Sequence, residues 1–210
     1  MNIADNADVL LITDTLKKIT MKRKYLIISF IVYCLLISHI SKSYGQPFDK
    51  PISFTAKLNA IEKVPIIDMP GFNLDEVLKE DSLRRANGHE VFKFAKPFVV
   101  NINIKEKALV ESLPDGSKVY RLGIRSKCAY SLNVYFDDHF RIDNNSKLFA
   151  YSLDKKHVRG PFSHNDAIRN RNFHIRHVKG DVIYFEIYEP NPSGSDNKFV
   201  ISRVNHDYRG

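Results

Sequence analysis

The sequence predicts an all-β fold, an antiparallel β-sandwich of jelly-roll-like character with one short N-terminal helix. After Gly88, apolar residues recur at every second position, the period of strands that turn one side to a core and the other to water. Turn-forming residues separate these runs at short intervals, and the one clear helix signal precedes them. Many short strands without intervening helices are typical of β-sandwiches.

Residues 1–45 are expected to be absent from the folded domain. Met21 is followed by three cationic residues, an apolar run, and small residues at positions 43 and 45, which is the order of a secretory signal peptide over 21–45. We expect cleavage between Gly45 and Gln46 and a secreted, periplasmic or cell-surface product without a membrane segment. The alternative, a membrane anchor, is disfavoured because the apolar run is shorter than the roughly 20 residues of a span. Residues 1–20 are interpreted as a mis-assigned leader upstream of the true start.

The start of the mature chain combines an extended segment with a helix. Residues 46–72 contain four prolines, which favour extended backbone. A helix is predicted within 73–88, with Asn73 as its N-cap and Glu76 three residues later, the spacing of a capping box. Gly88 suits the end of this helix.

Residues 89–210 form the predicted sandwich domain. Strands are expected at 98–104, 120–124, 132–136, 148–153, 173–178, 182–188 and 199–204. The turns expected between strands include Gly160-Pro161. The run 182–188 is apolar on both faces, which predicts a central strand. Its Glu186 is expected to pair with Arg121 or, alternatively, to face solvent, because a lone buried charge is costly.

Charge and cysteine content narrow the function classes. The formal net charge is +8, and the cations are dispersed except around residues 169–179, so nucleic-acid binding is not expected. A basic loop facing an acidic partner or the cell envelope is the alternative. After signal cleavage only Cys128 remains, so no internal disulfide can form. We expect this cysteine to be a small buried residue rather than a nucleophile.

No metal or other cofactor is predicted. His174 and His177 lie three apart in a predicted strand and would point to opposite faces, so they cannot hold one ion together. A site completed by His164 is the alternative. Asp and Asn clusters at 137–138 and 143–145 offer oxygen ligands for calcium, but such clusters are also ordinary turn sequences.

Four aromatic residues are candidates for a binding face. Tyr130, Tyr135, Phe149 and Tyr151 could form one exposed sheet surface that holds a glycan or a protein, but core packing is the favoured interpretation for most of them. The absence of tryptophan weakens the glycan interpretation.

Several phrases in the second half of the chain resemble one family. They are Pro114-Asp115-Gly116, Val119-Tyr120-Arg121-Leu122, Ala129-Tyr130-Ser131-Leu132-Asn133, Val158-Arg159-Gly160-Pro161-Phe162, Gly180-Asp181-Val182-Ile183-Tyr184-Phe185-Glu186 and Val204-Asn205-His206-Asp207-Tyr208-Arg209-Gly210. This region resembles the N-terminal, non-catalytic part of lysyl endopeptidase-like, trypsin-like secreted serine peptidases of Bacteroidetes. Tyr120, where the family often has tryptophan, and Cys128 depart from the family pattern.

The resemblance implies a role in proteolysis without catalysis by this chain. In the family a catalytic domain follows the His-x-Tyr-Arg-Gly phrase, and its serine lies in a Gly-Asp-Ser-Gly-Gly motif that this sequence lacks. We therefore expect an accessory or pro-region, here as a truncated fragment, whose partner is the peptidase catalytic domain, normally in cis. The alternative is a stand-alone extracellular module that binds a protein or glycan.

Overall fold

The computed structural model describes residues 21–24, 26, 50–88, 92–169 and 172–209. The chain divides into two compact units, 1–48 and 49–210. In the first unit the described residues are helical. The expected cleavage site at Gly45 and Gln46 lies outside the described residues. Among the described residues, none of the helices combines the length and apolar character needed to cross a membrane.

The second unit is built mainly from strands that form two sheets. Sheet A has the strand order β1-β4-β9-β6-β7, with β3 also paired to β4, and sheet B has the order β2-β10-β5-β8. The strands are β1 (Ile66–Asp68), β2 (Ala95–Asn103), β3 (Leu109–Ser112), β4 (Lys118–Arg125), β5 (Ser131–Phe136), β6 (Lys147–Ser152), β7 (Val158–Phe162), β8 (His174–Lys179), β9 (Val182–Glu189) and β10 (Val200–Asp207). The predicted all-β class is confirmed.

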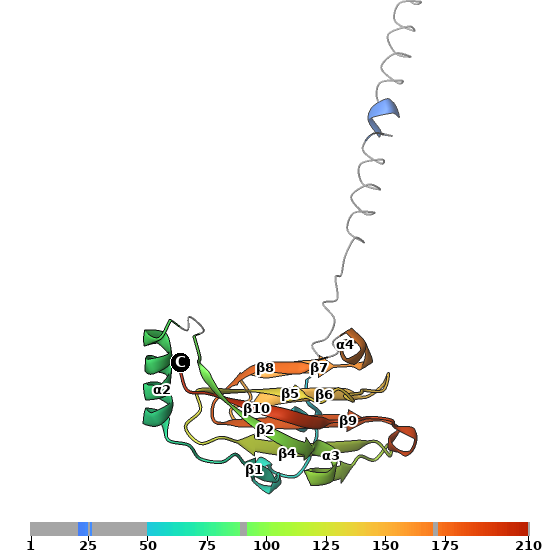
Figure 1. The fold of residues 1–210 in the computed structure, drawn as a ribbon. Helices are drawn as coiled ribbons and strands as arrows, with labels where there is room; N and C mark the ends of the chain where they lie inside the picture. The colour runs from blue at the N-terminus through green and yellow to red at the C-terminus, as the bar shows by residue number, and fades with distance from the viewer. Residues whose placement is uncertain (1–20, 25, 27–49, 89–91, 170–171, 210) are drawn as a thin grey trace, which may run out of the picture. The chain divides into compact units, whose positions relative to one another are not determined.

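Helices are few and short. They are α2 (Leu74–Ala86), α3 (Ile104–Lys107) and α4 (His164–Arg169), with 3₁₀ turns at Ile52–Phe54, Ile61–Lys63 and Pro192–Gly194. Helix α2 is the predicted one, and the Asn73 side chain accepts hydrogen bonds from the backbone N–H groups of Asp75 and Glu76 as an N-cap does. It lies at one end of the sandwich, beside the C-terminal end of β10 (Figure 1).

The main core lies between the sheets. It consists of alternate residues of the long strands, such as Leu122 and Ile124 of β4 and Leu132 and Val134 of β5, all at 0% exposure. A second apolar cluster covers the opposite side of sheet A, where Phe149, Tyr151 and Tyr184 are buried together. Because of these two clusters β9 is buried on both sides, and its predicted central position is confirmed.

Three local expectations were wrong. The strand β1, inside the segment expected to be merely extended, pairs with β4 in parallel, so sheet A is not purely antiparallel. Gly160-Pro161, expected in a turn, lies within β7, an edge strand where proline is tolerated because no ladder partner needs its N–H. The helical turns α3 and α4 were also not expected, since four to six residues are too few to show a helical period.

Glu186 does not form the expected ion pair with Arg121. The two residues are direct neighbours across β4 and β9, but the Arg121 guanidinium donates to Glu111, with Nε 3.0 Å from Oε2. Glu186 is fully buried and accepts hydrogen bonds from the backbone N–H of Ser53, with both oxygens at 3.3 Å. Burial raises the pKa of the Glu186 carboxyl above its usual value. A chain segment preceding the sandwich therefore satisfies this carboxylate.

Candidate functional site

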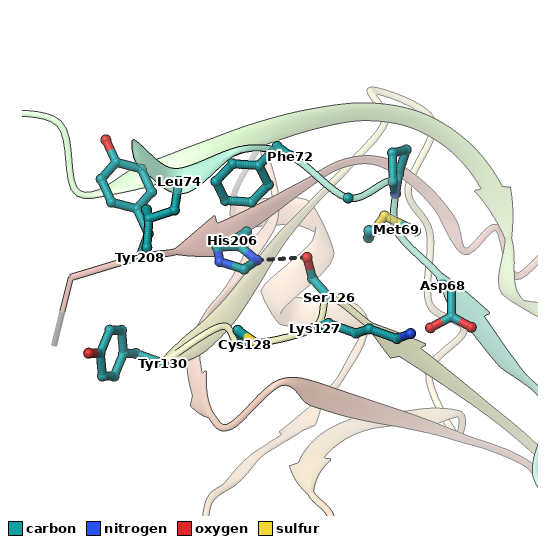
Figure 2. A pocket seen from close by; sticks show the side chains of 12 residues that line it. Asp68, Met69, Phe72, Leu74, Ser126, Lys127, Cys128, Tyr130, His206 and Tyr208 are labelled. Carbon is teal, nitrogen blue, oxygen red and sulfur yellow. Dashed lines mark hydrogen bonds between the residues drawn. The ribbon is translucent and has the colours of Figure 1, made fainter. Parts of the chain in front are cut away.

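A pocket of about 740 Å³ lies at the α2 end of the sandwich. Three segments that are far apart in the sequence form it: the link from β1 to α2, the link from β4 to β5, and the end of β10. It is lined by Asp68, Met69, Pro70, Gly71, Phe72, Leu74, Ser126, Lys127, Cys128, Tyr130, His206 and Tyr208. Figure 2 shows these side chains around the opening. A concave, largely apolar surface with a few polar groups is typical of ligand sites.

A buried serine–histidine pair lies within this pocket. The Oγ atom of Ser126 is 2.7 Å from Nδ1 of His206, and both residues are almost fully buried. The ring of Phe72 meets the imidazole edge-on, with centroids 4.7 Å apart. Burial lowers the pKa of His206, so the imidazole is neutral at pH 7. Its Nδ1 atom and the Ser126 hydroxyl form one hydrogen bond, and the tautomer of the imidazole sets which of the two groups donates.

The end of β10 points consecutive side chains to opposite sides of sheet B. His206 points into the pocket, while Asp207 accepts hydrogen bonds on the other side from Ser131 and from His177, whose Nδ1 is 2.5 Å from Oδ2. The alternation follows from strand geometry. Neither member of the Ser126–His206 pair is therefore oriented by this carboxylate, as a nucleophile–base relay would require.

The contacts of Asp207 also differ from a catalytic triad. In a triad the histidine lies between the serine and the acid, whereas here Asp207 lies between Ser131 and His177. The acid bonds Nδ1 of His177, and the serine approaches that same nitrogen at 3.5 Å instead of Nε2. Asn133 adds a hydrogen bond to the acid at 3.4 Å. The cluster links strands β5, β8 and β10 and is suited to holding them in register.

The last described residues fasten the helix beside the pocket. Tyr208 donates its hydroxyl to Oδ2 of Asp81 at 2.8 Å, and Arg209 reaches the same oxygen at 3.3 Å. Asp81 is the only buried residue of α2. Burial and this hydrogen bond raise the pKa of Tyr208 to about 12, so its hydroxyl remains a donor at neutral pH. The attachment fixes α2 and with it the Phe72 and Leu74 wall of the pocket.

Cys128 is exposed, contrary to the expectation that it is buried. It belongs to the link between β4 and β5, where its φ of 66° is in the left-handed region that non-glycine residues rarely adopt. This backbone places the thiol on the pocket wall beside Lys127, and the alternation of β5 begins only at Ser131.

The four candidate aromatic residues do not share one exposed face. Tyr130 is 59% exposed and lines the pocket, and Tyr135 is half-buried on the outer side of sheet B. Phe149 and Tyr151, each 1% exposed, belong to β6 of sheet A and are covered by the second apolar cluster. These two therefore do not belong to an exposed binding face, and the favoured interpretation, core packing, holds for them. The segment before β1 covers them: the ring of Phe54 meets Tyr151 edge-on at 5.0 Å.

The residues weighed for metal binding are not clustered. Within the described part of the chain, no group of three or more His, Cys, Asp or Glu side chains is placed to hold a metal ion. His164 bonds the backbone oxygen of Ile142 at 2.8 Å through Nδ1, while His174 stacks on Tyr135. Asp137 is used in a turn, where it accepts the backbone N–H of His139.

Sequence reasoning missed the pocket, although one signal was present. The alternation His206-x-Tyr208 in the terminal phrase indicates two side chains on the same side of one strand end. Their partners Ser126 and Asp81 lie 80 and 127 residues away, and nothing local reveals them. The chain matches no family model, and the searches of curated proteins and of solved structures gave no match either.

Proposed function

We propose that this chain is a secreted, non-catalytic β-sandwich domain that acts as the accessory or pro-region of a trypsin-like, lysyl endopeptidase-like serine peptidase. The proposal rests on the structural contacts that the residues of the terminal His-x-Tyr-Arg phrase make. His206 lines the pocket, Asp207 ties three strands together, and Tyr208 and Arg209 hold α2. A phrase with this many structural contacts belongs to the folded domain rather than to a linker. A catalytic domain that followed it would begin beside the pocket.

We further propose that the sandwich is a jelly roll. What supports this is the order of its eight long or edge strands, β2-β10-β5-β8 in one sheet and β4-β9-β6-β7 in the other. In this order the last strand, β10, lies between β2 and β5, the first and third of the eight. Most consecutive strands along the chain belong to different sheets, as two Greek keys require.

In the proposed role, the pocket receives a segment of the peptidase. Its wall combines apolar groups such as Met69 and Leu74 with the phenol ring of Tyr130, and aromatic anchors of this kind dominate the binding energy of protein interfaces. Lys127 adds one cation at the same wall. A bound domain at this end would mask a peptidase or assist its folding without taking part in the chemistry.

The proposal is tested with the purified exported chain and a trypsin-like, lysine-specific endopeptidase. We expect the chain itself to leave a Lys-amide substrate uncleaved and to slow its hydrolysis by the peptidase reversibly. Replacing the pocket residue Tyr130→Ala should weaken this inhibition by about ten-fold, the loss typical of an interface anchor. The control Val110→Ala removes an exposed apolar side chain from β3 and should leave inhibition unchanged.

Two results would count against this role. Turnover of the Lys-amide by the chain alone would make it a hydrolase. Absence of a Gly-Asp-Ser-Gly-Gly segment from the coding sequence beyond Gly210, read in all frames, would favour an independent module.

A second candidate function, a stand-alone extracellular binding module, is favoured by the pocket itself. A volume of about 740 Å³ suits a small ligand or one residue-sized group of a larger partner. Glycan-array and pull-down experiments with the same Tyr130→Ala variant separate this function from the first, because they do not involve a peptidase.

A further inference from the structure

The outer sides of the two sheets differ in character. On sheet A the outer side is apolar and covered, with Phe149 and Tyr151 buried beneath the segment before β1. On sheet B the outer side is polar and open. Its exposed side chains include Val99, His174, Arg176, His177, Lys179 and Arg203. We call these six residues, together with Tyr135, the outer face of sheet B.

A row of three side chains crosses this face. Arg203 of β10, Tyr135 of β5 and His174 of β8 are direct neighbours in the strand register. The Arg203 guanidinium lies 4.0 Å from the centre of the Tyr135 ring, and the His174 ring stacks on it at 5.1 Å and 19°. Since β10 and β8 lie on opposite sides of β5, both faces of the phenol ring are occupied. The contact holds the guanidinium in place.

Charge on the outer face of sheet B is mainly positive. Arg203, Arg176 and Lys179 form no ion pair with a carboxylate of the described residues, and Arg159 of the neighbouring β7 donates to the backbone oxygen of His177 at 3.1 and 2.9 Å. The Asp207 carboxylate is buried and bonded to His177, so it contributes little at the surface. One exposed acid, Asp138, lies beside a hollow of about 380 Å³ next to Arg203.

The composition of the face favours an acidic polysaccharide over other anionic partners. Protein interfaces need clustered aromatic or large apolar anchors. This face has two exposed large apolar side chains at separate places, Val99 opposite Arg203 and Phe94 beside the ring of His177. Single-stranded nucleic acids need aromatic surfaces for base stacking, and both sides of the Tyr135 ring are already filled. Guanidinium groups, by contrast, bind carboxylate or sulfate in a forked geometry.

Neutral hydrogen-bonding groups complete this surface. Asn205 of β10 donates to the side-chain oxygen of Asn133 on β5 at 2.7 Å, which fixes both amides beside the Arg203 row. Fixed amides offer donors and acceptors to the hydroxyl groups of a sugar.

We propose that the outer face of sheet B binds an acidic polysaccharide, with its carboxylate or sulfate groups held by Arg203 and by the cations of β8. This proposal depends neither on the pocket nor on a peptidase.

The test measures migration of the purified chain in native gels that contain polygalacturonate, dextran sulfate or neutral dextran. We expect retardation by one or both acidic polymers and none by dextran, and the two acidic polymers distinguish a carboxylate from a sulfate ligand. The variant Arg203→Ala should weaken binding by about ten-fold, a typical loss for a charge-assisted contact. The matched control Arg84→Ala, which removes an exposed arginine from α2, should bind like the unchanged chain.

A second variant, Lys179→Glu, tests the same face at an exposed edge position and should also weaken binding, whether or not Arg203→Ala folds fully. The proposal is overturned if neither acidic polymer retards the chain, if Arg84→Ala weakens binding as much as Arg203→Ala, or if single-stranded DNA binds more tightly than both polymers. None of these outcomes bears on inhibition of a peptidase, which is measured separately.

Discussion

His206 and Asp207 have opposite environments although they are adjacent in the sequence. The imidazole is enclosed in the pocket beside Ser126, while the carboxylate accepts hydrogen bonds on the other side of β10. The strand period places them on opposite sides of β10. Burial lowers the pKa of His206 by more than the charge of Asp207 raises it.

The stability of the protein should fall as the pH is lowered below about 6.5, the ordinary pKa of histidine. The folded state holds the pKa of His206 below that value, so at lower pH the unfolded chain binds a proton that the folded chain does not. The measurement is urea unfolding between pH 7.5 and 5. The variant His206→Gln should lose part of this slope, and should be about 1–3 kcal/mol less stable at pH 7 because Ser126 loses its buried partner.

The exposed residue His174 supplies the control for this experiment. His174→Gln replaces an exposed histidine and should keep most of the stability of the unchanged chain. An identical pH dependence in the unchanged chain and in His206→Gln would show that the burial of His206 does not govern it.

Residue burial was predictable where a strand period was present and not elsewhere. Leu132 and Val134 follow the alternation and are buried as expected. Cys128 precedes the first residue of β5, in a link whose left-handed backbone turns its side chain outward, and no period applies there. Phe149 and Tyr151 lie on the side of β6 that faces away from the main core, and the segment that covers this side makes them core residues.

At the scale of elements, helix α2 is attached by polar contacts rather than by an apolar stripe. Its only buried residue is Asp81, which Tyr208 and Arg209 bind. The capping residue Asn73 determines where the helix begins, and this was visible in the sequence. The anchoring contact was not, because its two sides are 127 residues apart.

Replacing Asp81→Ala should release α2 while leaving both sheets folded. We expect a loss of about 1.5–3 kcal/mol for hydrogen bonds to a charged group. Hydrogen exchange should become at least about ten-fold faster for the amides of residues 74–86 and should stay unchanged in the long strands, because a local opening exposes only its own amides. The neighbouring variant Glu80→Ala, at an exposed position, should leave exchange in the helix nearly unchanged. Equal acceleration throughout the sandwich would contradict a local role for Asp81.

The strands show which elements a sequence pattern reveals. All seven strands expected from the sequence are present, as β2, β4, β5, β6, β8, β9 and β10. The strands β1, β3 and β7 have three to five residues, which is too short for a period of two to stand out. The parallel pairing of β1 with β4 is decided when the sheet assembles, and the sequence of β1 alone does not show it.

At the scale of the whole molecule, one core connects the two sheets. Phe173, just before β8, stacks on Phe140 at 4.2 Å and also contacts Phe136 of β5 and Phe162 of β7. Its ring therefore bridges sheet B and the edge of sheet A. Since each sheet depends on the other to cover its apolar side, neither is expected to remain folded alone.

This dependence predicts that both sheets unfold in one transition, and that Phe173→Ala destabilises them together. Removing a buried phenylalanine should lower the free energy of unfolding by about 3–5 kcal/mol, since it leaves a cavity in a shared core. Urea unfolding followed by circular dichroism, and hydrogen exchange of amides in β4 and in β5, should give coincident midpoints in the unchanged chain and in the variant. Val99→Ala, at a position 88% exposed, should change stability by no more than about 0.5 kcal/mol. If β5 lost protection at a lower urea concentration than β4, the sheets would be separate folding units, and Phe173 would stabilise sheet B alone.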